Sequence, residues 1–220
     1  MSQRRFIDLS HPIENGMITY PGLPAPVISD FWSRESTRGR YSEGATFQIG
    51  RIDMVANTGT YLDAPFHRYA EGSDVAALPL EKLVDVPGIR INLTAREGRA
   101  IEEAALSGLS LRGRAVLFHT GWDAHWRTPR YNEGHPYLTR SAAELLVAEQ
   151  AALVGIDSLN IDGTDDGSRP VHTLLLEAGI PILEHLTGLH RLPEEGFRLH
   201  AVPAPLVGVG SFPVRAYAIL

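Results

Sequence analysis

Residues 57–67, with the sequence NTGTYLDAPFH, gather polar side chains that can bind a cation or move a proton. Among them are Asp63 and His67, and the chain has no cysteine, so imidazoles and carboxylates are its strong metal ligands. Taken alone, Asp63 fits a turn residue that caps a backbone N–H, and His67 fits a structural histidine. Gly59-Thr60 before the pair and Pro65 within it favour a fixed, unusual backbone, which supports a functional segment.

The same segment resembles the signature His-x-Gly-Thr-His-x-Asp-x-Pro-x-His of the cyclase family, which includes bacterial kynurenine formamidases and isatin hydrolases. Asn57 and Tyr61 stand where the signature has its first two histidines. Other blocks of the chain resemble family blocks in the expected order, so the resemblance covers essentially the whole sequence. They are residues 8–13, 120–122, 154–158, 172–184 and 213–219.

The resemblance implies a mechanism. Hydrolases of this family use one or two divalent cations to polarise a carbonyl and to lower the pKa of a bound water, while a histidine shuttles the proton. Asp63 and Glu184 match carboxylates that can bridge two metals, and His172 matches a ligand of the second metal. His67 matches the proton-transfer residue. Tyr20 stands where kynurenine formamidases place a substrate-facing tryptophan on the N-terminal arm.

The two missing histidines affect the first metal of the family's pair. An amide oxygen is a poor zinc ligand, and a phenol near its usual pKa of about 10 is neutral, so Asn57 and Tyr61 do not replace the imidazoles. Asp63, His172 and Glu184 can still form an open three-ligand site for one divalent ion, zinc or manganese; a site without metal is the alternative. Candidates for replacement ligands elsewhere in the chain are Gln48, His119 and His185.

Tyr61 has two interpretations. Its ring fills the space of a lost metal, or its phenol, beside His67, donates a proton or a hydrogen bond to an oxyanion. A large phenol in a polar pocket normally needs a partner for its hydroxyl, which favours its recruitment to the chemistry. Asn57 and Tyr20 are expected to contact the substrate.

Short apolar segments alternate with a few helices along the chain. Patterns typical of strands occur at residues 6–9, 47–54, 88–93, 115–118, 153–156 and 180–184. Ser141 and Glu144 have capping-box spacing, which predicts a helix from 141 to about 150, and a second helix is expected at 172–178. The proline-rich stretch at 20–26 belongs to an extended arm over residues 1–30. We therefore predict one α/β domain over residues 1–220, with a mixed sheet core and flanking helices like those of the cyclase fold.

Composition and motif searches exclude several function classes. A formal net charge of −6 without a basic stripe argues against nucleic acid or anionic lipid as partners. The chain shows no signal-peptide core or membrane span, so we expect a cytoplasmic protein. Residues 208–211 lack the third glycine of a dinucleotide fingerprint, and the acidic turn at 162–167 does not have EF-hand spacing. That turn is expected to form a loop beside the site.

Together, these observations predict a hydrolase of an amide, lactam or related acyl bond in a small cyclic or aromatic molecule. One alternative is a metal-free enzyme in which His67 and Tyr61 catalyse an acid–base cyclisation, isomerisation or dehydration. Another is a non-catalytic small-molecule-binding protein, although a site without activity has no reason to keep so many costly polar groups. The family's use of an arm from the neighbouring subunit predicts a homodimer or larger homo-oligomer, with Tyr20 near the partner's pocket.

Overall fold

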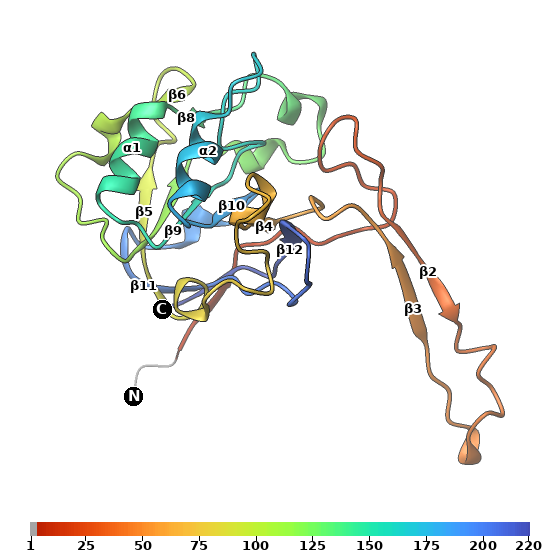
Figure 1. Cartoon of the computed structure of the whole chain (residues 1–220). Coiled ribbons are helices and arrows are strands. Elements are labelled where there is room, and N and C mark those ends of the chain that lie inside the picture. Colours follow the sequence, from red (N-terminus) through yellow and green to blue (C-terminus); the bar gives the residue numbers. More distant parts are fainter. Residues whose placement is uncertain (1–3) are drawn as a thin grey trace.

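A nine-stranded mixed sheet forms the centre of the computed structural model, which describes residues 4–220 (Figure 1). Its strands follow the order β1-β13-β11-β5-β7-β9-β10-β4-β12. The middle of the sheet, β5-β7-β9-β10, is parallel, and antiparallel strands extend it on both sides. The bounds are Phe6–Asp8 (β1), Tyr61–Asp63 (β4), Val86–Asn92 (β5), Ala115–His119 (β7), Leu153–Ile156 (β9), Ile182–Glu184 (β10), Glu195–His200 (β11), Ser211–Pro213 (β12) and Tyr217–Ile219 (β13).

Two α-helices pack together over one face of the sheet (Figure 1). Helix α1 spans Arg140–Ala148, and its N-cap is Thr139, whose side chain accepts a hydrogen bond from a backbone N–H of the first turn at 3.3 Å. Helix α2 spans Pro170–Glu177, and its first turn begins with a proline, whose fixed φ suits that position. Both helices were expected from the sequence, but each starts earlier: the cap is not Ser141, and α2 begins before His172.

The sheet is buried on both faces because its central strands are wholly apolar or nearly so. Val116 and Phe118 belong to a core cluster that includes residues of both helices, whereas Leu117 belongs to the cluster on the opposite face. The ring of Phe197 in β11 fills the space above Gly88, where a Cβ would lie 1.9 Å from the ring. The mainly apolar character of β7, β9 and β10 is the pattern that predicted these strands from the sequence.

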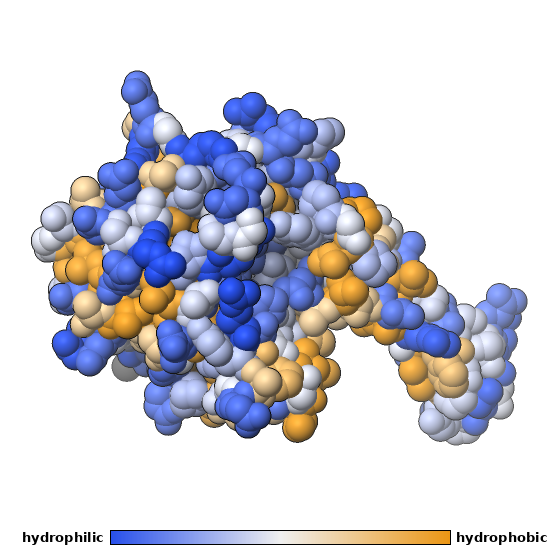
Figure 2. Space-filling view, turned by 45° about the horizontal axis from the view of Figure 1, so that its top comes forward, coloured by the Kyte–Doolittle hydropathy of each residue, from blue (hydrophilic) through white to orange (hydrophobic). Residues whose placement is uncertain are grey.

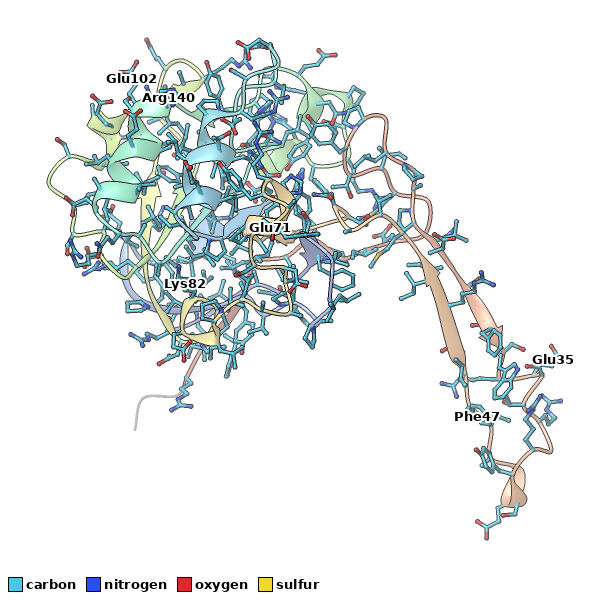
Figure 3. The ribbon with its side chains drawn as sticks, viewed as in Figure 1. Glu35, Phe47, Glu71, Lys82, Glu102 and Arg140 are labelled. Carbon is cyan, nitrogen blue, oxygen red and sulfur yellow. The ribbon has the colours of Figure 1, made fainter. Side chains whose placement is uncertain are left out.

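A long antiparallel hairpin projects from the body of the molecule (Figure 1). It is formed by β2 (Val27–Trp32) and β3 (Ile49–Asp53), and Figure 3 places Glu35 and Phe47 on it, far from Arg140 on the body. Since β1 belongs to the central sheet, the projecting part is residues 27–53, displaced along the chain from the arm expected over residues 1–30. The proline-rich stretch 20–26 leads into it.

The structure confirms the predicted α/β class with a large mixed sheet and few helices. A separate two-stranded parallel sheet joins Ala100–Ile101 (β6) to Tyr137–Leu138 (β8). Within residues 4–220, the helices are too short or too polar to cross a bilayer.

Candidate active site

Strands β4, β10 and β12 lie side by side and bring distant parts of the chain together. In their antiparallel registers, Asp63 lies opposite Ser211, and Tyr61 lies opposite Glu184. The first turn of α2 delivers His172 to the same place. The side chains line a pocket of about 390 Å³. Its lining residues are Tyr20, Pro21, Gly22, Leu23, Asn57, Tyr61, His67, Asn160, His172 and Glu184.

His172 is surrounded by buried carboxylates. Its Nδ1 lies 2.7 Å from Asp162 Oδ2, and Asp162 also accepts hydrogen bonds from the backbone N–H groups of Val171 and His172. Its Nε2 lies 3.7 Å from Asp63 Oδ2 and 3.6 Å from Glu184 Oε1. Burial disfavours a charge on His172, but the three carboxylates outweigh it and raise the pKa to about 10. The Nε2 atom is therefore where this network holds a proton or a cation.

Asp63 Oδ2 is the strongest indication of a cation site. This buried oxygen has no hydrogen-bond partner among residues 4–220, although buried carboxylate oxygens normally have one. Ligand atoms of one tetrahedral zinc ion, each about 2.0–2.2 Å from the metal, lie about 3.3–3.6 Å apart. The separations of His172 Nε2 from Asp63 and Glu184, 3.7 and 3.6 Å, are close to this range. The residues therefore fit one divalent ion.

The ligand atoms of Asp63, His67 and His172 lie within 4.8 Å of one another, so the structure gathers these three residues as a ligand set for such an ion. The set expected from the sequence has Glu184 in place of His67. Glu184 Oε1 lies 3.6 Å from His172 Nε2, but among residues 4–220 Glu184 does not join the set gathered within 4.8 Å. Asp63 and His172 are common to both sets. Burial alone would raise the pKa of Asp63, but the neighbouring His172 and His67 hold it below its ordinary value, so this carboxylate is charged and ready to bind.

Both carboxylate oxygens of Glu184 accept hydrogen bonds from the protein. The backbone N–H of Ile161 donates to Oε1 at 2.8 Å, and the Tyr61 hydroxyl donates to Oε2 at 2.5 Å. Burial raises the pKa of Glu184 to about 7. Burial also raises the pKa of Tyr61 well above its ordinary value, with the charges of Glu184 and Asp63 adding to the shift, so the phenol keeps its proton. The hydrogen bond from Tyr61 thus occupies one oxygen of Glu184 and competes with a metal ion for it.

His67 lies at the edge of the pocket in a network with Ser211 and Asp63. The Ser211 hydroxyl donates a short hydrogen bond to Asp63 Oδ1, and its oxygen lies 2.9 Å from His67 Nδ1. A hydroxyl has one proton to donate, so Ser211 can only accept from His67, and His67 carries its proton on Nδ1. In the neutral ring, Nε2 is then the nitrogen without a proton. Gly210 permits this approach, because a Cβ there would lie 2.5 Å from the His67 backbone nitrogen.

Of the other residues singled out in the sequence, Tyr20 and Asn57 line the pocket. Tyr20 lines the pocket of its own chain, whereas the sequence predicted that it lies near the pocket of a partner subunit. The three candidate replacement ligands lie in other surroundings: Gln48 bonds Asp30 on the hairpin, His119 bonds Arg90, and the fully buried His185 bonds the Tyr131 hydroxyl at 2.8 Å.

Sequence reasoning did not assign a role to Asp162, Ser211 or Asn160. Asp162 opens the acidic turn that was expected beside the site, and its position ten residues before His172 was the available signal. Ser211 lies 148 residues from Asp63, in a short strand with no recognisable pattern. Only the pairing of β4 with β12 brings it to the site.

Comparisons with known proteins agree with this fold. A family model described as "Putative cyclase" matches residues 7–163. A kynurenine formamidase of Bacillus cereus is 28% identical over an alignment of 222 positions, which covers 98% of this chain and 98% of the relative. A solved structure described as a predicted metal-dependent hydrolase from Bacillus stearothermophilus has a TM-score of 0.80 at 29% identity and covers 99% of both chains. Isatin hydrolase A from Labrenzia aggregata has a TM-score of 0.83 at 21% identity, covering 99% of this chain and 94% of its own, which supports the shared fold.

Proposed function

This chain belongs to the cyclase family, and we propose that it hydrolyses an amide, lactam or related acyl bond in a small cyclic or aromatic molecule, with one zinc or manganese ion at Asp63 and His172. The relatives named as kynurenine formamidase and isatin hydrolase support this class of reaction. The observation that carries the proposal is the buried Asp63 oxygen without a protein partner, 3.7 Å from His172 Nε2 and next to an open pocket.

The chain's own residues account for binding and proton transfer. When bound, a divalent ion polarises a carbonyl oxygen and lowers the pKa of water. Asp162 fixes the ring of His172 through Nδ1, which leaves Nε2 as the ligand atom. Ser211 contacts His67 at Nδ1, so in the neutral ring Nε2 is the atom that takes a proton from the attacking water and returns it to the leaving nitrogen. Tyr20 adds an aromatic side chain to the lining of the pocket, where it can contact the substrate.

A metal-free acid–base enzyme is the second candidate, and one observation favours it. With its pKa raised to about 10, a protonated His172 places a positive charge among Asp63, Asp162 and Glu184 without an ion. In that case His67 is the remaining acid–base group, because the Tyr61 proton is bound to Glu184.

Elemental analysis and an amidase assay together test the two candidates. The protein is purified without added metal, analysed by mass spectrometry, and assayed with formanilide, a neutral aromatic formamide, before and after chelation. We expect about one zinc or manganese ion per chain, and hydrolysis that chelation abolishes and added metal restores. Metal-free protein with undiminished hydrolysis would favour the second candidate. Absence of hydrolysis in the metal-loaded protein would contradict the proposed function.

We also propose that the chain forms a homodimer or larger homo-oligomer through the hairpin β2–β3. Isolated two-stranded hairpins are marginally stable in water. Here Ile28 and Ile52 lie opposite each other, and Ile52 and Phe31 are 60% and 61% exposed. Apolar patches follow the hairpin and its junction with the body (Figure 2). A second copy of this chain would cover them. The predicted cytoplasmic location stays a prediction.

Light scattering of point variants tests this assembly. Ile52→Lys is expected to convert the oligomer to a monomer, because it places a charge in the apolar contact. Leu80→Lys is the matched control, since Leu80 is 59% exposed on the body of the molecule. A monomeric wild-type protein, or an Ile52→Lys variant that assembles like the wild type, would contradict the proposal.

A further inference from the structure

Arg169 places a positive charge next to the substrate pocket. It is the residue immediately before α2, three positions before His172. Its Nη1 is bonded to the carbonyl of Gly163, next to Asp162, which holds the ring of His172 at the pocket. Burial and the charge of Glu184 raise the pKa of Tyr20, which also lines the pocket, and the charge of Arg169 opposes that rise. The ten residues that line the pocket include no lysine or arginine. Arg169 is therefore the cation available at this side of the pocket.

Half of the guanidinium is already engaged. Nη1 donates to the backbone carbonyls of Gly163, Asp166 and Ser168 at 3.0, 2.8 and 2.5 Å. These bonds hold the group in place at the end of the acidic turn. They use the protons of Nη1 and leave Nη2 and Nε, which can bind a carboxylate side-on with two hydrogen bonds.

The acidic side chains of the turn do not neutralise Arg169. Asp165 pairs with Arg99 at 3.0 Å, and the Asp166 carboxylate accepts hydrogen bonds from the backbone and hydroxyl of Ser168 at 2.7 and 2.6 Å. Asp166 contributes only a backbone oxygen to Arg169. Within residues 4–220, the guanidinium thus has carbonyl partners but no ion pair, although a charged group near a pocket gains from one.

We propose that Arg169 recognises a carboxylate on the aromatic substrate, so that the protein prefers anionic aromatic amides to neutral ones. The inference rests on the proposed function and adds the substrate's charge to it. Asp63 and Glu184 at the metal site repel an anion, whereas Arg169, at the end of the turn that begins at Asp162, attracts it. These opposite charges therefore orient the substrate: the carboxylate faces Arg169, and the scissile carbonyl faces His67 and His172.

A purely structural role for Arg169 makes a different prediction. If the guanidinium only holds the turn 162–168 through its carbonyl bonds, its removal affects anionic and neutral substrates alike. A recognition role affects the anionic ones alone. The comparison of two substrate charges on one variant separates the roles.

The test uses formanilide and its ortho, meta and para carboxylated derivatives with the wild type, Arg169→Gln and Arg169→Lys. We expect the wild type to prefer at least one carboxylated isomer, and Arg169→Gln to lower kcat/KM for that isomer by about 10–100-fold, mainly through KM, because a charge-assisted hydrogen bond is lost. Formanilide itself should change little. Arg169→Lys should keep part of the preference, since it retains the charge but loses the bidentate geometry.

Arg99→Gln is the control for the turn, because Arg99 pairs with Asp165 but does not carry charge to the pocket. An equal loss for neutral and carboxylated substrates in Arg169→Gln, or a wild type without preference, would overturn the inference while leaving the hydrolase proposal intact. If the wild type hydrolyses none of the formanilides, the proposed function fails. In that case, calorimetry that compares the binding of aminobenzoates with the binding of aniline tests the role of Arg169 by itself. Equal affinities of the wild type for aminobenzoate and aniline would overturn the inference. So would an Arg169→Gln variant that binds aminobenzoates as tightly as the wild type.

Discussion

Replacing His67 with alanine is expected to lower kcat by about 10²–10⁴-fold, the usual contribution of a positioned proton-transfer group. The reason lies in the hydrogen-bond network. Ser211 donates to Asp63 and accepts from His67 Nδ1, so the unprotonated Nε2 is the nitrogen left to act as a base. The side chain is 37% exposed, so its removal should leave the melting temperature and ligand binding nearly unchanged.

The measurement pairs turnover with metal content. His125→Ala is the matched control, because His125 lies on another segment and bonds Arg130 rather than any residue of the pocket. It should retain full activity. Wild-type rates in His67→Ala would remove His67 from the mechanism. A parallel loss of metal and activity would instead make His67 a ligand, in the set that it can form with Asp63 and His172.

The sequence predicted the centre of the fold better than its edges. Strands β7, β9 and β10 are buried throughout, so they appear in the sequence as short, mainly apolar runs. Strand β5 is buried at every position but three, and its alternating isoleucines mark it. Strands β4, β12 and β13 have three residues each and include polar positions, so no periodicity marks them. Their existence depends on pairing with neighbours that are far away in the chain.

The candidate site also has a part that the sequence predicted and a part that it did not. Residues 57–67 place Asp63 and His67 through local sequence, and α2 and β10 place His172 and Glu184 at the ends of recognisable elements. The partners of these groups depend on strand register. The bond between Tyr61 and Glu184 exists because β4 and β10 pair with these residues opposite each other. The sequence favoured recruitment of the Tyr61 hydroxyl to the chemistry, whereas its bond to Glu184 favours the other interpretation, in which its ring and hydroxyl occupy the space of a metal.

The register leads to a second large expected effect, in the double variant Asn57→His and Tyr61→His. Removing the phenol frees Glu184 Oε2, which now accepts its proton at 2.5 Å. The two introduced imidazoles lie near Asp63. Its Oδ1 accepts a hydrogen bond from Ser211, and its Oδ2, on the side of His172, has no hydrogen-bond partner among residues 4–220. Two imidazoles and a carboxylate are a sufficient ligand set for a further zinc ion. Metal content should therefore rise from about one to about two ions per chain.

Tyr61→Phe separates metal binding from the loss of the hydroxyl. It keeps the ring in the core, where Tyr61 is 3% exposed, but leaves Glu184 Oε2 without its donor, so it should be less stable without gaining an ion. Turnover of the double variant then decides the role of the phenol, because an imidazole bound to a metal cannot donate the proton that a catalytic phenol would supply. Unchanged or higher turnover with an added ion means that Tyr61 only replaced a metal. Loss of turnover despite the added ion means that its hydroxyl takes part in the reaction. A double variant that folds but gains no ion would contradict the prediction, and would show that the pocket differs from a two-metal site at more than these two positions.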